Sequence, residues 1–226
     1  MIYQLLNLFY PKVCAGCEAL LLSNEYVICT SCRHEIPLTL HHTVDNKEVM
    51  SKFYGRLDVQ FVGTLFYFHK KGIVQEMIHK LKYKGHEEIG TAIGLWYGSE
   101  LKNQLILKDV DYIIPVPLHQ KRYKKRGYNQ VMTFGEALSS SLQIPMHTEL
   151  LVRTKYTETQ VWKNLVERSN VAEKGFEVLD YSKLQHKHFL LIDDVITTGA
   201  TLEACGRELL KIPGARLSIV CMAMTQ

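Results

Sequence analysis

An apolar run that ends in two adjacent carboxylates constrains the fold of this chain more than any other segment. Phe189 to Ile192 predicts a buried strand, and Asp193 and Asp194 follow where that strand is expected to end. A short polar loop comes next, and a helical pattern then runs from Leu202 to Lys211. In open α/β sheets, units of this kind bind ligands at the carboxyl ends of the strands.

The polar residues of this segment fit a sugar phosphate. Hydroxyls and backbone N–H groups at a helix start can hold a phosphate, and the loop offers Thr197, Thr198, Gly199, Ala200 and Thr201. The carboxylates repel a phosphate, but they accept hydrogen bonds from sugar hydroxyls or bind a hydrated Mg²⁺. A phosphate beside hydroxyls indicates a ribose 5-phosphate. An ordinary strand–turn–helix is the alternative, although packing alone gives no reason for two acids followed by Thr-Thr-Gly.

This segment resembles the phosphoribosyl-pyrophosphate (PRPP) binding motif of type I phosphoribosyltransferases. The resemblance implies that Asp193 and Asp194 hold the ribose hydroxyls and that the loop holds the 5′-phosphate. It also implies Mg²⁺, bound together with PRPP.

Four of the six cysteines form two Cys-x-x-Cys pairs, Cys14 with Cys17 and Cys29 with Cys32. Such pairs predict a structural zinc site, because four thiolates close a tetrahedron and leave no open position. Gly16 is expected to supply left-handed backbone within the first pair. Disulfides would need an oxidising compartment.

Three other residues belong to this part of the interpretation. His34 is an alternative fourth ligand, although the spacing favours four cysteines. Cys205 and Cys221 lie far from the pairs, and we expect them to pack as small apolar residues.

The remaining pattern predicts an α/β domain. Strand-like segments at 59–68, 110–114, 189–192 and 217–222 alternate with helical segments at 73–84, 89–102, 134–142 and 202–211, and 150–152 is a further short strand. Alternation of this kind indicates a mostly parallel sheet with helices on both faces. We divide the 226 residues into an N-terminal helix and zinc ribbon (1–40), an irregular polar connector (41–58) and a phosphoribosyltransferase-like domain (59–226).

Charge and hydropathy argue against a membrane-spanning protein but exclude few other classes. The net charge of +4 is compatible with anionic ligands and does not establish nucleic-acid binding. No apolar run approaches the ~20 residues of a membrane-spanning helix. Residues 1–10 lack the features of a signal peptide and predict a short helix packed on the domain.

A basic arm follows the strand at 110–114. It places Lys121, Arg122, Lys124, Lys125 and Arg126 within six positions. Near the rim of the sheet these cations can bind pyrophosphate or follow a nucleic-acid backbone, and a solvated loop is the alternative. Arg122 and Arg126 suit phosphate best, because a guanidinium binds it bidentately.

Further motifs lie in segments 115–130, 153–160 and 164–170. Together with the cysteine pairs and the acid-pair motif, they resemble the ComF (ComFC or GntX-like) family over nearly the whole chain. The resemblance implies a cytoplasmic protein with a role in DNA uptake during natural competence. It implies single-stranded DNA, and a competence helicase or recombination protein, as partners. Thr157 and Gln160 match the family pattern and, with Arg153, belong to a candidate mobile loop over PRPP. An ordinary surface connection is the alternative.

Three functions follow from these motifs. The protein transfers ribose phosphate from PRPP to a nitrogenous acceptor, as in nucleotide salvage, or it binds PRPP without turnover. Alternatively, it is a non-catalytic adaptor that binds single-stranded DNA. No segment identifies the acceptor or a catalytic residue.

Overall fold

A four-stranded parallel sheet forms the centre of the molecule. The computed structural model describes residues 11–43, 46–154 and 175–226. The strands are β1 (Phe61–Tyr67), β2 (Tyr112–Pro115), β5 (His188–Ile196) and β6 (Arg216–Met224), in the order β1-β6-β5-β2. All three pairings are parallel. The predicted fold class is therefore confirmed.

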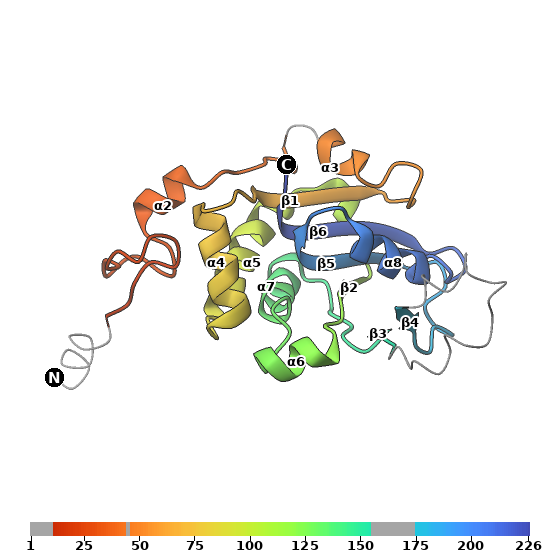
Figure 1. Ribbon diagram of the computed structural model, residues 1–226. Helices are drawn as coiled ribbons and strands as arrows, with labels where there is room; N and C mark the ends of the chain where they lie inside the picture. The colour runs from red at the N-terminus through yellow and green to blue at the C-terminus, as the bar shows by residue number, and fades with distance from the viewer. Residues whose placement is uncertain (1–10, 44–45, 155–174) are drawn as a thin grey trace.

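Helices cover both faces of this sheet (Figure 1). One face carries α4 (Ile73–Tyr83), α5 (Glu88–Leu101) and α7 (Met132–Leu142), and the other carries α3 (Lys47–Ser51) and α8 (Ala200–Leu209). Side chains of β5 alternate between the two cores, with Leu190 and Ile192 on the α4 side and Phe189 and Leu191 on the α8 side. Burial on both faces explains why the strand reads as a continuous apolar run.

Small residues allow α5 and α7 to pack closely. A Cβ atom at Gly94 would lie 2.6 Å from the Cβ of Ala137, and one at Gly98 would lie 2.5 Å from the Cβ of Ser141. Larger side chains at these positions would push the two helices apart and distort the face on which α4 rests.

The shorter elements lie around this framework. They are α2 (Thr30–Glu35), the 3₁₀ helix η1 (Leu105–Leu107), α6 (Gln120–Arg126), β3 (Leu151–Arg153) and β4 (Phe176–Val178). β3 and β4 form a separate antiparallel pair. Within the described residues, no helix combines the length and the apolar character that a membrane crossing requires.

The predicted irregular connector contains a helix that packs on the sheet. Val49, on α3, and Phe53, just beyond it, are fully buried in the α8-side core. Their spacing of four residues places both side chains on one face of a helical turn, which explains how a polar segment is anchored. Thr39 also pairs with β1 through its backbone N–H and Leu65 O, 3.0 Å apart. The three-part division of the chain stays a prediction, and the helix expected at 1–10 lies outside the described residues.

Candidate functional site

A cleft opens at the carboxyl edge of the sheet because β2 ends before β5 does. Pro115 is the last residue of β2, and its register partner is Ile192. The backbone N–H of Val116 still donates to Ile192 O at 3.0 Å, and Pro117 follows. Proline has no N–H to extend the ladder. Three residues of β5, Asp193 to Val195, therefore border a cavity of about 220 Å³, which we call the acid-pair cavity.

The acid pair lies within β5 rather than after it. Asp193 pairs with Cys221 of β6, and the strand continues to Ile196. Both acids line the acid-pair cavity. Asp193 Oδ1 accepts the backbone N–H of Asp194 at 2.8 Å. The sequence-based strand ends four residues too early, because two charged side chains interrupt the apolar pattern while the backbone pairing with β6 continues.

Asp194 is buried and held on both oxygens. Lys82 Nζ lies 2.9 Å from its Oδ1, and the side-chain amide of Gln130 donates to its Oδ2 at 2.6 Å. Arg126 donates to the amide oxygen of Gln130 at 2.7 Å. Asp194 is thus the centre of a network that joins β5, α4 and α6.

Asp193 has a different electrostatic environment. Burial, and then the neighbouring Asp194 carboxylate, raise the pKa of Asp193 to about 7, although Lys82 and Arg122 act in the opposite direction. Near neutral pH this group can exchange a proton when a cation or a hydroxyl binds to it.

The loop after β5 has the geometry of an anion site. Thr197 and Thr201 line the acid-pair cavity, while Thr198 is exposed and Ala200 begins α8. Gly199 adopts a left-handed conformation, with φ of 77°, immediately before the helix. The N–H groups in the first turn of α8 and the helix dipole favour an anion there.

Two cationic side chains that follow α3, Lys52 and Arg56, bind backbone carbonyls of this loop, and we call this pair the brace. Lys52 Nζ donates to Thr197 O at 3.2 Å and to Thr225 O at 3.1 Å. Arg56 donates to Thr198 O at 2.9 Å and also binds Glu203 of α8. These contacts fix two backbone carbonyls of the loop.

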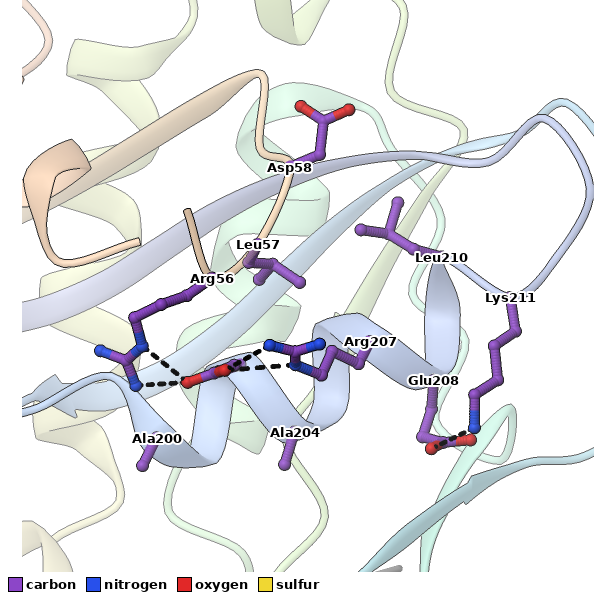
Figure 2. A pocket seen from close by; sticks show the side chains of 10 residues that line it. Arg56, Leu57, Asp58, Ala200, Ala204, Arg207, Glu208, Leu210 and Lys211 are labelled. Carbon is purple, nitrogen blue, oxygen red and sulfur yellow. Dashed lines mark hydrogen bonds and ion pairs between the residues drawn. The ribbon is translucent and has the colours of Figure 1, made fainter. Parts of the chain in front are cut away.

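The hollow beside this brace is a weaker candidate, although it is larger. It has a volume of about 540 Å³ along α8, and Figure 2 shows its side chains. Arg56 and Arg207 bind the same carboxylate, that of Glu203, and Lys211 binds Glu208 at 2.6 Å. Its principal charges are therefore already compensated within the protein.

The basic arm is a helix, α6, with two different faces. His119 caps its start by accepting the N–H of Lys121 at 3.1 Å, and Gly127 ends it with φ of 82°. Arg122 and Arg126 are four residues apart, and both line the acid-pair cavity. Lys124 and Lys125 are exposed and do not line it.

Two residues of this site were missing from the sequence-based set. Lys82 lies in the helical segment predicted at 73–84, and Gln130 ends the segment 115–130 that resembles the ComF family. Both contact Asp194. The resemblance at 115–130 was the available signal for Gln130, but no periodicity or spacing connects either residue to β5.

The candidate mobile loop is only partly described. Arg153 lines the acid-pair cavity, and its guanidinium lies 5.0 Å from the ring centroid of Phe176. Thr157 and Gln160 lie outside the described residues.

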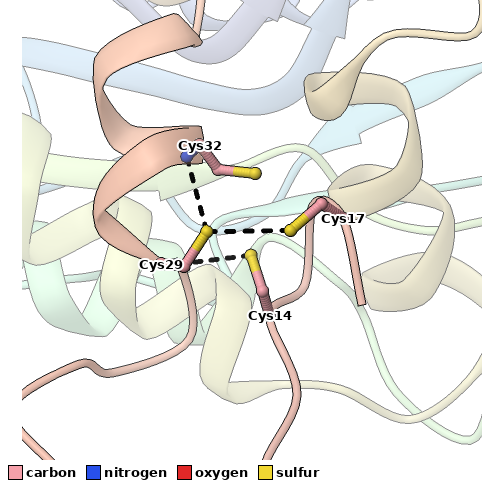
Figure 3. Close-up of side chains that lie close together, drawn as sticks. All are labelled: Cys14, Cys17, Cys29 and Cys32. Carbon is pink, nitrogen blue, oxygen red and sulfur yellow. Dashed lines mark hydrogen bonds between the residues drawn. The ribbon is translucent and has the colours of Figure 1, made fainter. Parts of the chain in front are cut away.

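The N-terminal cysteines form a second, separate site (Figure 3). Their four Sγ atoms lie within 4.8 Å of one another, and Cys17 Sγ and Cys29 Sγ are 3.7 Å apart. Zn–S bonds of ~2.3 Å in a tetrahedron place sulfurs ~3.8 Å apart, so the donor set fits a four-thiolate metal site. His34 is not part of this group, and all six cysteines are free thiols.

Backbone N–H groups lower the pKa of one thiol in this cluster. Burial acts to raise the pKa of Cys14, but N–H groups of Cys29, Cys17 and Gly16 lower it to about 7. Burial and the neighbouring thiols raise the pKa of Cys32. One predicted detail is wrong, because Gly16 has no positive φ. Glycine is needed there for space, since a Cβ would lie 2.7 Å from Ile73 Cγ2.

The cysteine module contacts the main domain through charged and aromatic groups. The Arg33 guanidinium of α2 lies 4.5 Å from the ring centroid of Trp96, on α5. Lys80 of α4 lies 3.1 Å from Glu18. The module therefore contacts α4, which also carries Lys82.

A parallel sheet with an acid pair and a Thr/Gly loop at its carboxyl edge defines a phosphoribosyltransferase-type protein. The family model "Phosphoribosyl transferase domain" matches residues 131–225. The chain is 30% identical over 152 residues to the DNA utilization protein YhgH of Escherichia coli, covering 66% of each chain. It is 26% identical over 218 residues to the competence protein F of Haemophilus influenzae, covering 91% of this chain and 88% of the relative.

With these relatives and the four-cysteine cluster, the chain belongs to the ComF family. The competence protein ComFC of Bacillus subtilis is 25% identical over 205 residues, covering 88% of this chain and 78% of the relative. A solved PRPP amidotransferase from B. subtilis aligns with 62% of this chain and 30% of its own, at 13% identity and a TM-score of 0.42.

Proposed function

We propose that the acid-pair cavity binds PRPP. Asp193 and Asp194 accept hydrogen bonds from the ribose hydroxyls, and the loop from Thr197 to Thr201 holds the 5′-phosphate. Arg122 and Arg126 bind the pyrophosphate. One observation carries this proposal: guanidinium groups from α6 and carboxylates from β5 line a single cavity of about 220 Å³ that also reaches the loop.

The oxygen donors of the acid pair also suit Mg²⁺. Mg²⁺ prefers carboxylate and water oxygens and is usually held by one or two carboxylates plus substrate phosphates. Asp193 is the favoured ligand, because both oxygens of Asp194 already have protein partners. The ion would neutralise charge on the pyrophosphate, and ionisation of Asp193 would accompany its binding.

The reaction we propose is transfer of ribose 5-phosphate to a nitrogenous acceptor. The protein supplies position and electrostatics rather than a nucleophile. The Arg126–Gln130–Asp194 network links the pyrophosphate side of the cavity to the ribose side, so it holds both ends of the ligand in register.

Calorimetry with PRPP and Mg²⁺ tests this proposal. We expect Arg122→Ala to weaken PRPP binding at least tenfold, because Arg122 lines the cavity. Lys124→Ala, on the same helix outside the cavity, is the matched control and should bind as the parent does. Folded protein that fails to bind PRPP, or equal losses in the two variants, would refute the assignment.

A second function rests on the outer face of α6. Lys121, Lys124 and Lys125 are exposed, and the Tyr123 side chain beside them is 53% exposed. Exposed cations with an aromatic ring suit a single-stranded nucleic acid, since bases stack on aromatic rings. Relatives named DNA utilization and competence proteins support a role connected with DNA. We propose that this role is DNA uptake in the cytoplasm, with a helicase or recombination protein as partner.

Labelled single-stranded DNA titrated over a salt series tests this second function. Binding should weaken as salt rises, because cations on the protein displace counterions from the backbone. Lys124→Ala combined with Lys125→Ala should weaken DNA binding and leave PRPP binding unchanged. Arg122→Ala should weaken PRPP binding and leave DNA binding unchanged. Binding that is absent, or that does not depend on salt, would exclude a phosphate-tracking surface.

We further propose that the cysteine cluster holds zinc in a structural role. Four thiolates suit Zn²⁺ and leave no position for a substrate. Metal analysis of the purified protein should give about one zinc per chain, as expected for a single four-thiolate site. Protein that is folded and free of metal would exclude the assignment.

A further inference from the structure

A second cavity adjoins the acid-pair cavity. It has a volume of about 580 Å³ and lies at the carboxyl ends of β1, β6 and β5, beside α4. Lys82, Val195 and Thr197 line both cavities. This second cavity, which we call the apolar cavity, therefore adjoins the acid-pair cavity along these three residues.

The walls of the apolar cavity suit a flat ring. Phe68 follows β1, Ile78 and Tyr83 come from α4, and Val195 comes from β5. The Tyr83 side chain is 52% exposed although it lies beside the cavity. Aromatic rings favour stacked or edge-to-face contacts. The Arg126 guanidinium lies 4.9 Å from the Tyr83 ring centroid, so an inserted ring would contact Tyr83 through its edge or its other face.

The charges around the apolar cavity select the kind of ring. Among the described residues that line it are three lysines, Lys70, Lys71 and Lys82, and no carboxylate. Lys82 is neutralised by Asp194, but Lys70 and Lys71 are exposed at the rim. Such a rim favours an anion and disfavours a cation.

We propose that the apolar cavity is the acceptor site and that the acceptor is a planar aromatic or heteroaromatic acid with a nucleophilic nitrogen. This inference rests on the proposed binding of PRPP in the neighbouring cavity. The ring packs against Phe68 and Tyr83, and its carboxylate faces Lys70 and Lys71. The nitrogen then points toward the side on which Lys82, Val195 and Thr197 line both cavities.

The step itself balances without any further reactant. The nitrogen lone pair forms a bond to C1 of the ribose while the bond from C1 to the pyrophosphate oxygen breaks. The electron pair of the broken bond leaves with pyrophosphate. An acceptor N–H loses its proton to water, so the products are the N-ribosyl phosphate, pyrophosphate and one proton.

Paired probes that differ by one carboxylate test the proposal. Orotate and uracil share a ring, as do anthranilate and aniline, and binding to the full chain is measured by ligand-observed NMR and calorimetry. At least one acid should bind tenfold or more tightly than its uncharged counterpart. Equal binding of acid and counterpart, or no binding of either acid at millimolar concentration, would overturn the proposal.

Charge reversal at the rim supplies the second measurement. Lys70→Glu with Lys71→Glu should weaken the acid at least tenfold and leave PRPP binding unchanged. Lys102→Glu with Lys108→Glu makes the same change in net charge away from both cavities, and should leave the acid unaffected. If both pairs weaken the acid equally, the rim does not select the ligand. If the parent protein, without these substitutions, does not bind PRPP, the result refutes the proposed function rather than this inference.

Discussion

Replacing Asp193 with asparagine should stabilise the free protein, and the gain should grow with pH. Burial and the Asp194 carboxylate raise the pKa of Asp193 from 3.8 to about 7. Between these values the folded protein binds more protons than the unfolded chain, so the free energy of unfolding falls as pH rises. The loss begins near the unfolded pKa and is complete above the folded pKa.

The size of the effect follows from the shift. One pKa unit corresponds to ~1.4 kcal/mol. Raising the pKa from 3.8 to about 7 therefore lowers the free energy of unfolding at pH 8 by at most ~4 kcal/mol. Roughly half of this, ~2 kcal/mol, accrues between pH 5.5 and pH 8. Asparagine has nearly the same shape and does not ionise, so the variant lacks this penalty at every pH.

Urea unfolding of both proteins at pH 5.5, 7 and 8, without PRPP or added Mg²⁺, measures the difference. The variant's advantage should widen by ~2 kcal/mol across this range. Any contribution of the cysteine cluster is common to both proteins and cancels in the difference. An advantage that stays constant or narrows as pH rises would refute the reasoning.

The neighbouring acid provides the control. Asp194→Asn removes the partner of Lys82, whose side chain is only 20% exposed. Breaking a buried pair leaves an uncompensated charge and costs ~3 kcal/mol or more. Adjacent aspartates should thus respond with opposite signs at pH 8, and destabilisation by both substitutions would show that Asp193 is also an ion-pair partner.

Three further predictions concern the loop, its brace and the cysteine cluster. Gly199→Ala should cost ~1–2 kcal/mol in urea unfolding because its φ is 77°. It should cost more than Gly55→Ala, which has a similar φ and open space around it. Arg56→Ala should weaken PRPP binding several-fold in calorimetry, although Arg56 does not line the acid-pair cavity. Cys17→Ser should abolish bound metal and lower the Tm, whereas Cys205→Ser should retain the metal; equal metal content would contradict the four-thiolate assignment.

Local chemistry in the chain was sufficient to predict the fold class and the main ligand groups. The apolar run before Asp193 requires a strand buried on both faces, and the loop after it requires a helix start. The cysteine pairs bring their thiolates together through short turns. These inferences succeed because the interacting groups are close in sequence or obey the period of a strand or helix.

The parts that were missed depend on contacts between distant segments. Gln130 is 64 residues from Asp194, and Lys52 is 145 residues from Thr197. The irregular connector was misjudged because Val49 and Phe53 become core residues only when α3 lies on the sheet.

The sequence by itself determined which groups are available: two carboxylates, a hydroxyl and glycine loop, a basic arm and four thiolates. Only the tertiary structure decided which of these groups lie together at one cavity. Folding of the arm into α6 turned Arg122 and Arg126 toward the acid pair and left Lys124 and Lys125 outside the cavity. The early end of β2 opened the cleft, and α4 brought Lys82 to Asp194. Residue identity determines charge and hydrogen bonding, whereas the direction of a side chain depends on the element that carries it and on the packing around it.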